Sequence, residues 1–485
     1  MYLACATVIV HLLTGGQYGF QRDELATLED ARHLAWGYVA YPPVTPFFGR
    51  LSLELFGTSL RGFRFFAAVA QASAVVLTGL MARELGGRRW AQVVAAMAAL
   101  PFCLGGGALM QYVSFDYLCW VLVGYFTLRL LKSDDSRWWI AIGGAIGLGM
   151  LSKYAMPFLV AGLVAGVLFT GNRKYLASKW LWVGVAVSVV IFLPNLFWQM
   201  QHNLVSLDFL RYVHTRDVGQ GRHRGFMLGQ VKLTLLALPI WIVGLYFYFV
   251  SPLGKRFRML GWLYLVPLLL FIVAKGRDYY VAGSYPVLYA AGAVCLERWI
   301  GSQPRLWSQF LRRFIWTGLL VDVAIAMAFS LPVAPIHSNW FKIANRLNGD
   351  LREEIGWPDL VETVAGIRDS LPAEDRAHLG ILGTNYGEAG ALNLYGPRYG
   401  LPAAISGVNS FWFRGYGDPP PRVLIVLGLS REVVEKKFTS CQLAAHTWNR
   451  FGVANEETVQ HPDIFVCRGP RENWPEFWKH FRYYG

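Results

Sequence analysis

The chain has 485 residues, of which 54% are hydrophobic, 15% are aromatic and only 16% are charged. A positive mean hydropathy together with 19 Trp and 23 Tyr excludes an ordinary soluble protein and is typical of a polytopic membrane protein with aromatic belts. The net charge of +14 does not indicate nucleic-acid binding, because the Lys and Arg residues lie in short clusters between apolar runs and not along one face.

Apolar runs of bilayer length recur along the chain. The first, Met1 to Leu13, is short for a span and lacks the basic leader and small-residue cleavage site of a signal peptide. The predicted spans cover residues 1–14, 62–82, 91–109, 115–131, 138–152, 154–170, 180–197, 226–250, 259–274, 280–296 and 314–331. We therefore expect a mainly α membrane protein with about eleven transmembrane helices.

The charges between the spans predict their orientation. Basic clusters follow every second span, at residues 83–89, 132–137, 173–179, 255–258 and 298–313. Because cytoplasmic connections carry excess Lys and Arg, these connections and the N-terminus are expected inside. The remaining connections, at 15–60, 110–114, 153, 198–225 and 275–279, and everything after 331, then face outward. Some of them are also basic, and outward positive charge indicates a ligand that neutralises it.

The pattern changes near residue 332. Apolar segments at 379–383, 422–427 and 464–467 are predicted strands, and helices are expected at 386–394 and 430–438. Strands that alternate with helices indicate a small α/β domain outside the membrane. Cys441 and Cys467 lie in this polar part, where they pair if the compartment is oxidising; two separate buried thiols are the alternative.

The first long connection, 15–60, carries closely spaced acids, among them Asp23 and Glu24. Carboxylates next to apolar segments are costly to desolvate, so their presence here requires an explanation. One explanation is structural, since Asp23 and Glu24 can cap a helix or bind Arg22. However, Asp116 stands at the outer start of the fourth span, so two spans present acids to one face. This arrangement favours a functional role.

These features resemble the glycosyltransferase C superfamily. The shared order is an apolar helix, a long outer loop with Asp-Glu, Trp36-Gly37-Tyr38 and Pro42-Pro43, and an acid at the fourth helix. The similarity is greatest to the family 39 branch, with protein O-mannosyltransferases and the lipid A aminoarabinose transferase, and is strongest at 18–60 and 192–210. It implies a ring of transmembrane helices, an outward active site and polyprenyl-phosphate sugar donors.

The resemblance also implies roles for individual residues. Asp23 corresponds to the base or acceptor-orienting carboxylate, Glu24 to its partner acid and Asp116 to the second-loop acid. The aminoarabinose branch has an acid and a Lys directly before the Pro-Pro pair, where this chain has Ala40 and Tyr41. Its lipid A specificity is therefore not implied here.

Outward cations are the candidates for binding the donor phosphate. Lys275 and Arg277 follow the ninth span, with Tyr280 close behind, and Lys153 separates the fifth and sixth spans. Interfacial anchors that snorkel to water are the alternative. Their position against the orientation bias favours phosphate binding instead. In addition, we expect His202, Arg211 and Tyr41 to contact the substrate, whereas residues 216–224 read as a solvated loop.

We therefore predict an integral membrane glycosyltransferase of the bacterial cytoplasmic membrane. Residues 1–331 form its transmembrane domain, with the catalytic outer loop 15–60, and residues 332–485 form an extracytoplasmic α/β domain. The enzyme moves a sugar from a polyprenyl phosphate to a hydroxyl or phosphate of a lipid, glycan or protein. Asp23 is the base, Glu24 and Asp116 orient it and the acceptor, and Lys275, Arg277, Lys153 and Tyr280 bind the donor phosphate.

No His, Cys or Asp spacing typical of a metal site is present. Asp23, Glu24 and Asp116 could together hold a divalent cation, as in oligosaccharyltransferases of the superfamily. The resemblance to family 39 implies that none is needed, so we expect no metal and no cofactor beyond the donor. The expected partners are the donor, the acceptor and membrane lipids, with no nucleic acid, and the chain is expected to be a monomer. Two alternatives from other classes remain. A secondary transporter predicts midplane charges and an internal repeat. A membrane-anchored binding protein would not need the acids of the first loop.

Overall fold

Every predicted apolar run is helical in the structure, a computed structural model that describes residues 1–485. The helices are α1 (Tyr2–Thr14), α5 (Phe65–Glu84), α6 (Arg89–Gly107), α7 (Tyr112–Ser133), α8 (Trp138–Met150), α9 (Met156–Phe169), α10 (Lys179–Gln201), α12 (Phe226–Thr234) with α13 (Leu238–Phe249), α14 (Arg258–Val273), α15 (Tyr285–Gly301) and α16 (Arg305–Ser330). Seven helical segments are long and apolar enough to cross a membrane, and α1, α8 and α9 are shorter apolar helices. The polytopic membrane fold is thus confirmed, and the exact number of spans stays a prediction.

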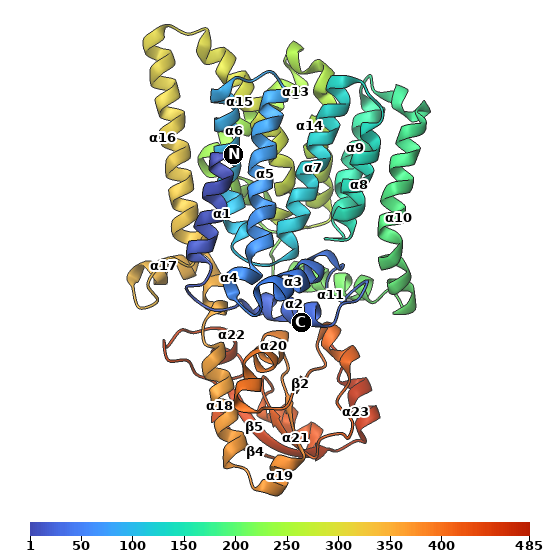
Figure 1. Cartoon of the computed structure of the whole chain (residues 1–485), viewed down its shortest axis with the longest axis vertical. Coiled ribbons are helices and arrows are strands. Elements are labelled where there is room, and N and C mark those ends of the chain that lie inside the picture. The colour runs from blue at the N-terminus through green and yellow to red at the C-terminus, as the bar shows by residue number, and fades with distance from the viewer.

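The helices stand side by side in one bundle (Figure 1). The buried centre includes α6, α7 and α15, whereas α10 and α16 leave most of their apolar residues at least partly exposed, as lipid-facing helices do. Close packing depends on small residues at some contacts. A Cβ added to Gly143 on α8 would lie 2.0 Å from the carbonyl oxygen of Gly184 on α10, so only Gly fits there.

The two ends of the bundle differ in charge, as the sequence predicts. The basic connections lie at the upper end in Figure 1, and the other connections lie at the lower end beside the C-terminal domain. Between bundle and domain lie the short helices α2 (Arg22–Arg32), α3 (Val44–Phe56), α4 (Leu60–Phe63), α11 (Val205–Gly219) and α17 (Asn339–Leu347). The connection 15–60 is therefore a folded helical layer.

The C-terminal domain is built on one five-stranded sheet in the order β2-β1-β3-β5-β4. Its strands are β1 (Leu379–Leu382), β2 (Ala404–Ile405), β3 (Val423–Val426), β4 (Phe438–His446) and β5 (Asp463–Pro470). The accompanying helices are α18 (Trp357–Ser370), α19 (Ala373–Ala377), α20 (Tyr386–Tyr395), α21 (Arg431–Lys437), α22 (Glu456–Val459) and α23 (Trp474–His480). Strands β1, β2 and β3 are parallel, and β5 runs antiparallel to β3 and β4. The three predicted strands are present, while β2 and β4 were not predicted.

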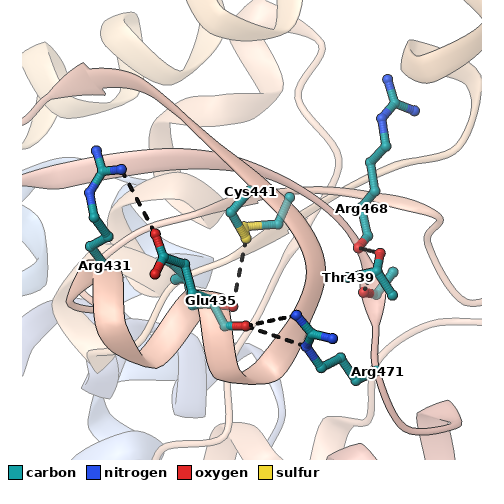
Figure 2. The surroundings of a disulfide bond; sticks show 9 residues. Arg431, Glu435, Thr439, Cys441, Arg468 and Arg471 are labelled. Carbon is teal, nitrogen blue, oxygen red and sulfur yellow. Dashed lines mark hydrogen bonds and ion pairs between the residues drawn. A yellow bond between two sulfur atoms is a disulfide. The ribbon is translucent and has the colours of Figure 1, made fainter.

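Cys441 and Cys467 form a disulfide between β4 and β5, where the two residues are directly opposite each other. Of the two alternatives left by the sequence, the structure therefore has the bonded one. Figure 2 shows the bond beside α21, where the side chain of Arg471 donates to the backbone carbonyl of Glu435. The bond closes a loop of 26 residues and ties the outer strand β4 to the sheet.

Candidate active site

A cavity of about 950 Å³ lies between the bundle and the C-terminal domain. Its lining comes from α2, from the turn before α9, from α11, from the connection between α14 and α15, and from the domain. Six of the ten predicted site residues line it: Asp23, Tyr41, Lys153, Lys275, Arg277 and Tyr280. The other four, Glu24, Asp116, His202 and Arg211, do not.

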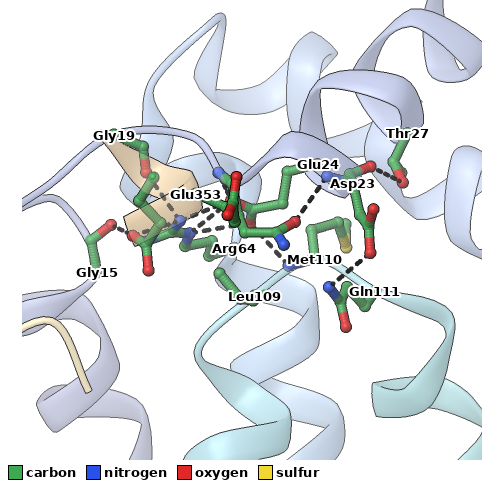
Figure 3. Close-up of polar contacts among 12 residues, drawn as sticks. Gly15, Gly19, Asp23, Glu24, Thr27, Arg64, Leu109, Met110, Gln111 and Glu353 are labelled. Atoms are coloured by element: carbon green, nitrogen blue, oxygen red, sulfur yellow. Dashed lines mark hydrogen bonds and ion pairs between the residues drawn. The ribbon is translucent and has the colours of Figure 1, made fainter. Parts of the chain in front are cut away.

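Asp23 lies in the first turn of α2, which begins at a capping box. The side chain of Gln21 accepts a hydrogen bond from the backbone N–H of Asp23, and the Glu24 carboxylate accepts one from the N–H of Gln21. A negative side chain is favoured at this end of a helix. The Asp23 carboxylate also accepts a hydrogen bond of 3.3 Å from Gln111, just before α7 (Figure 3). Asp23 thus bridges two connections at the end of the bundle that faces the C-terminal domain.

Glu24 points away from Asp23 into the protein (Figure 3). Its side chain is 0% exposed, and it binds the guanidinium of Arg64, with Nη2 2.6 Å from Oε2. Arg64 also binds Glu354 and the carbonyl oxygens of Gly15 and Gly19. The role in orienting the acceptor that we expected for Glu24 does not fit this placement. Glu24 instead joins the first loop to the start of α5 and to residue 354.

Asp116 lies one turn into α7, at the same end of the bundle as Asp23. Its carboxylate accepts a hydrogen bond of 3.1 Å from the indole N–H of Trp120 and is buried. Its charge acts on Lys153: burial lowers the pKa of the Lys153 ammonium, and Asp116 opposes that shift. Asp116 therefore lies behind the cavity wall and supports a cation there.

The membrane side of the cavity carries the cations. The Nζ of Lys153 lies 3.9 Å from the ring centroid of Tyr280, with Tyr112 and Tyr279 also nearby, a cation–π cage that leaves the ammonium without an ion pair. Lys275 likewise forms no ion pair, whereas Arg277 is bound to Asp217 at 2.6 Å. Lys153 and Lys275 are therefore the cations available to a ligand.

Backbone geometry positions Lys275. It has a φ of +50° and ends α14 in the left-handed region that usually takes Gly. The N–H of Gly276 donates to the carbonyl of Phe271, and the N–H of Lys275 donates to that of Ile272. These two bonds form a Schellman motif, which turns the chain sharply at the cavity. A Lys in this strained conformation is the kind of outlier found at binding sites.

The domain side of the cavity carries acids that sequence analysis missed. Asp350, Glu353, Glu388, Glu456 and Glu457 all line it. Glu353 and Glu457 each keep one buried carboxylate oxygen with no hydrogen-bond partner. These residues are spread over a hundred positions of ordinary polar sequence, so no local pattern marks them. The only signal is the capping motif at Asn385 and Glu388, which shows a helix start and not a site.

Burial raises the pKa of three of these acids. It raises the pKa of Glu457 to about 8 and that of Glu388 to about 7. It also raises the pKa of Asp350 to about 6, and the charge of Asp23 contributes to that shift. Arg22 pairs with Glu456 and lowers the pKa of Glu457 in part. The cavity thus has a cationic end at the membrane and an acidic end at the domain.

The loop at residues 383–387 also faces the cavity, after the carboxyl end of β1. Its backbone N–H groups at Thr384 and Asn385 donate to the carboxylate of Glu388, at 2.9 and 3.1 Å. An anion-binding loop is therefore already occupied by an acid of its own chain.

The remaining predicted substrate contacts have other partners. The Tyr41 hydroxyl donates to Asp30 at 2.6 Å and stays at the cavity wall. His202 stacks on Trp198, with ring centroids 3.9 Å apart, at the end of α10. Arg211 pairs with Asp208 at 3.2 Å on the exposed face of α11. His202 and Arg211 were predicted from loop position alone, and the structure does not bring them to the cavity.

Fold and cavity together define an integral membrane protein with an outer helical layer and a mixed domain over a charged chamber. A sequence profile of the dolichyl-phosphate-mannose-protein mannosyltransferase family matches residues 40–198. Lipid A galacturonosyltransferase RgtD of Rhizobium johnstonii (strain DSM 114642 / LMG 32736 / 3841) is 26% identical over 284 residues. That match covers 56% of this chain and 58% of the length of the relative.

Two solved structures share the whole fold. ArnT from Cupriavidus metallidurans bound to undecaprenyl phosphate has a TM-score of 0.64 at 16% identity, over 97% of this chain and 99% of that one. Its apo form has a TM-score of 0.62 at 16% identity, over 96% and 97%. The chain has the membrane fold of ArnT, and its resemblance to the glycosyltransferase C superfamily is confirmed.

Proposed function

We propose that the chain is a glycosyltransferase that takes a sugar from a polyprenyl phosphate and that the cavity of about 950 Å³ is its active site. The observation that carries this proposal is the meeting, in one chamber, of the Asp23 carboxylate with the unpaired ammonium groups of Lys153 and Lys275. The fold shared with ArnT, whose solved structure holds undecaprenyl phosphate, supports the same donor class.

The chemistry of such a transfer needs few groups. A phosphate ester is already a good leaving group, so departure from the anomeric carbon requires little acid catalysis. What remains is a base for the acceptor hydroxyl and cations where negative charge builds on the leaving phosphate. Asp23 supplies the base, and Lys153 and Lys275 receive the phosphate. Arg277, held by Asp217, lies beside them as a further positive group.

The donor enters from the membrane side of the cavity. Phe158 and Phe271 stack on each other at 4.3 Å between ring centroids and line the cavity next to the two lysines. They offer an apolar path for the first isoprene units. A phosphate beside Lys153 restores the charge that burial disfavours, because an anion raises the pKa of a neighbouring ammonium.

The acidic end at the domain narrows the choice of sugar and acceptor. RgtD is named a lipid A galacturonosyltransferase, and a uronic acid carries a negative charge. Glu353, which keeps a buried carboxylate oxygen without a partner, would repel such a carboxylate from the domain side. We therefore propose a neutral or cationic sugar, with a lipid, glycan or protein acceptor approaching beneath the domain.

The disulfide supports an oxidising compartment for the domain, and the basic connections at the opposite end of the bundle support the same orientation. We therefore propose that the active site lies at the outer face of the cytoplasmic membrane of a bacterium. We also propose that the chain acts as a monomer. The transporter alternative predicted charges at the midplane. The charged lining comes instead from connections at one end of the bundle and from the domain.

The experiment is the substitution Asp23→Asn, assayed by transfer from a radiolabelled polyprenyl-phosphate sugar in membranes. Loss of a general base lowers the rate by roughly 10²–10⁴-fold. Asp208→Asn, which removes an exposed acid outside the cavity, serves as the matched control. Undiminished transfer by Asp23→Asn would end the assignment. Because we propose catalysis without a metal, excess EDTA leaves the wild-type rate unchanged, and inhibition that Mg²⁺ or Mn²⁺ reverses would contradict that part.

A further inference from the structure

A second cavity, of about 500 Å³, lies on the other side of α2. Asp23 and Asp30 of α2 line the first cavity, whereas Glu29 of the same helix and His33, which follows it, line the second. Its remaining walls are Asn393 of α20, the edge of the sheet at β1 and β2, and the loop that runs from Phe411 to Pro421. The cavity thus forms where the first outer loop meets the C-terminal domain.

This cavity holds an acceptor and a donor that the protein leaves unused. Glu29 is only 4% exposed, yet its Oε2 has no hydrogen-bond partner. The basic side chains nearest to its carboxylate are His33 at 3.5 Å, Arg32 at 3.7 Å and Arg414 at 3.9 Å, and none of them forms a hydrogen bond with it. The Nη1 of Arg414 is likewise buried without a partner. Leaving both groups unsatisfied is costly, so the pair is a prepared binding site.

The charges in this cavity favour an uncharged ligand. Glu29 and Arg414 are its only fully charged lining residues, and they have opposite signs. An ionic ligand attracted to one of them is repelled by the other nearby. A hydroxyl group suits both, because it donates to the Glu29 carboxylate and accepts from the Arg414 guanidinium.

The other walls fit the same kind of ligand. His33, His378 and Asn393 add side chains that can hydrogen-bond, while Tyr416 and the proline run at 419–421 supply apolar surface. Apolar walls with a few convergent polar groups orient small polar molecules. A sugar ring has hydroxyls around its edge and C–H groups on its faces, which matches this combination.

We propose that this cavity is a saccharide-binding site, specific for neutral, hydroxyl-rich rings and separate from the reaction centre. Insofar as the protein is a transferase, as proposed above, the site holds sugar units of a glycan acceptor that lie away from the reacting hydroxyl. Arg414 connects the two cavities, since its Nη2 lies 2.5 Å from Asp30, a residue of the first cavity wall.

The test measures binding directly, on the full chain in a detergent without a sugar headgroup. Saturation-transfer difference NMR is recorded with methyl α-D-mannoside, methyl β-D-galactoside and chitobiose as probes. At least one of them binds the wild type with a dissociation constant on the order of millimolar. Glu29→Gln, which replaces an acceptor oxygen by a donor, weakens that binding by about tenfold or more.

Two further variants keep the result interpretable. Ala403→Trp fills the cavity from its exposed edge without touching Glu29 and also abolishes binding, even if Glu29→Gln folds poorly. Glu432→Gln, an exposed acid on α21, leaves binding unchanged. Asp23→Asn retains saccharide binding whether or not it loses transfer, so this test is independent of the proposed reaction. Absence of binding by all three probes, or equal binding by Glu29→Gln and the wild type, overturns the proposal.

Discussion

Replacing Arg64 with Met tests whether Glu24 is a structural acid. Arg64 is 3% exposed in its side chain and binds Glu24 at 2.6 Å, Glu354 at 3.1 Å and the carbonyl oxygen of Gly15 at 2.9 Å. The substitution leaves two buried acids without their counter-charge. Breaking a buried ion pair in this way costs about 3–5 kcal/mol.

Two features reduce that cost. Burial already raises the pKa of Glu354 to about 7, so Glu354 accepts a proton when Arg64 is removed. Glu24 also keeps hydrogen bonds from the N–H groups of Gln21 and Met110. We therefore expect the lower end of the range, about 3 kcal/mol. For a chain of 485 residues, 1 kcal/mol shifts the Tm by roughly 1 °C, so the Tm falls by about 3 °C.

The assay is thermal unfolding of the purified protein in detergent, followed by tryptophan fluorescence. Arg61→Met is the control, because Arg61 lies on the same short helix α4 but is exposed. Adding Glu24→Gln to Arg64→Met recovers part of the loss, since a neutral side chain is cheaper to bury than a lone carboxylate. If Arg64→Met and Arg61→Met unfold at the same temperature, Glu24 is not held as described.

Three further predictions concern the cavity and the domain. Burial raises the pKa of Glu457 from 4.5 to about 8, so the folded protein loses stability as the pH rises from 4.5 to 8. The variant Glu457→Gln therefore has a Tm about 2–4 °C above that of the wild type at pH 8 and the same Tm at pH 4.5. A lower Tm of the variant at pH 8 contradicts this prediction. Lys153→Met raises the donor KM by about tenfold or more through loss of a charged hydrogen bond, whereas Arg211→Met, outside the cavity, does not; equal KM values for the two refute the phosphate site. Cys441→Ser loses about 2–4 kcal/mol of stability. Dithiothreitol lowers the Tm of the wild type and leaves that of this variant unchanged; an unchanged Tm of the wild type would show that Cys441 and Cys467 are unpaired.

The helical bundle could be predicted because a helix that spans lipid consists of consecutive apolar residues, which are visible in the sequence. Apolar runs of bilayer length, and the basic residues that follow every second one, are local in the sequence. The edge strand β4 was not predictable in the same way. Its residues alternate only weakly in hydrophobicity, and its pairing with β5 depends on residues 17 to 32 positions further along the chain.

Only the site residues that lie close to the ends of the predicted spans could be predicted from the sequence. Asp23, Lys153 and Lys275 stand next to apolar runs and reach the cavity, as expected. The role of Glu24 could not be predicted, because its partner Arg64 lies 40 residues further on. Glu354, the other acid that Arg64 binds, lies a further 290 residues along the chain. The acidic end of the cavity was missed for the same reason, since tertiary contacts bring residues 350–457 to the first loop.

The most direct test of the central claim is a structure of the protein with undecaprenyl phosphate bound. Our account predicts the phosphate within about 3 Å of the Nζ atoms of Lys153 and Lys275, in the same chamber as the carboxylate of Asp23. A phosphate bound outside this chamber, or at the opposite end of the bundle, would contradict it.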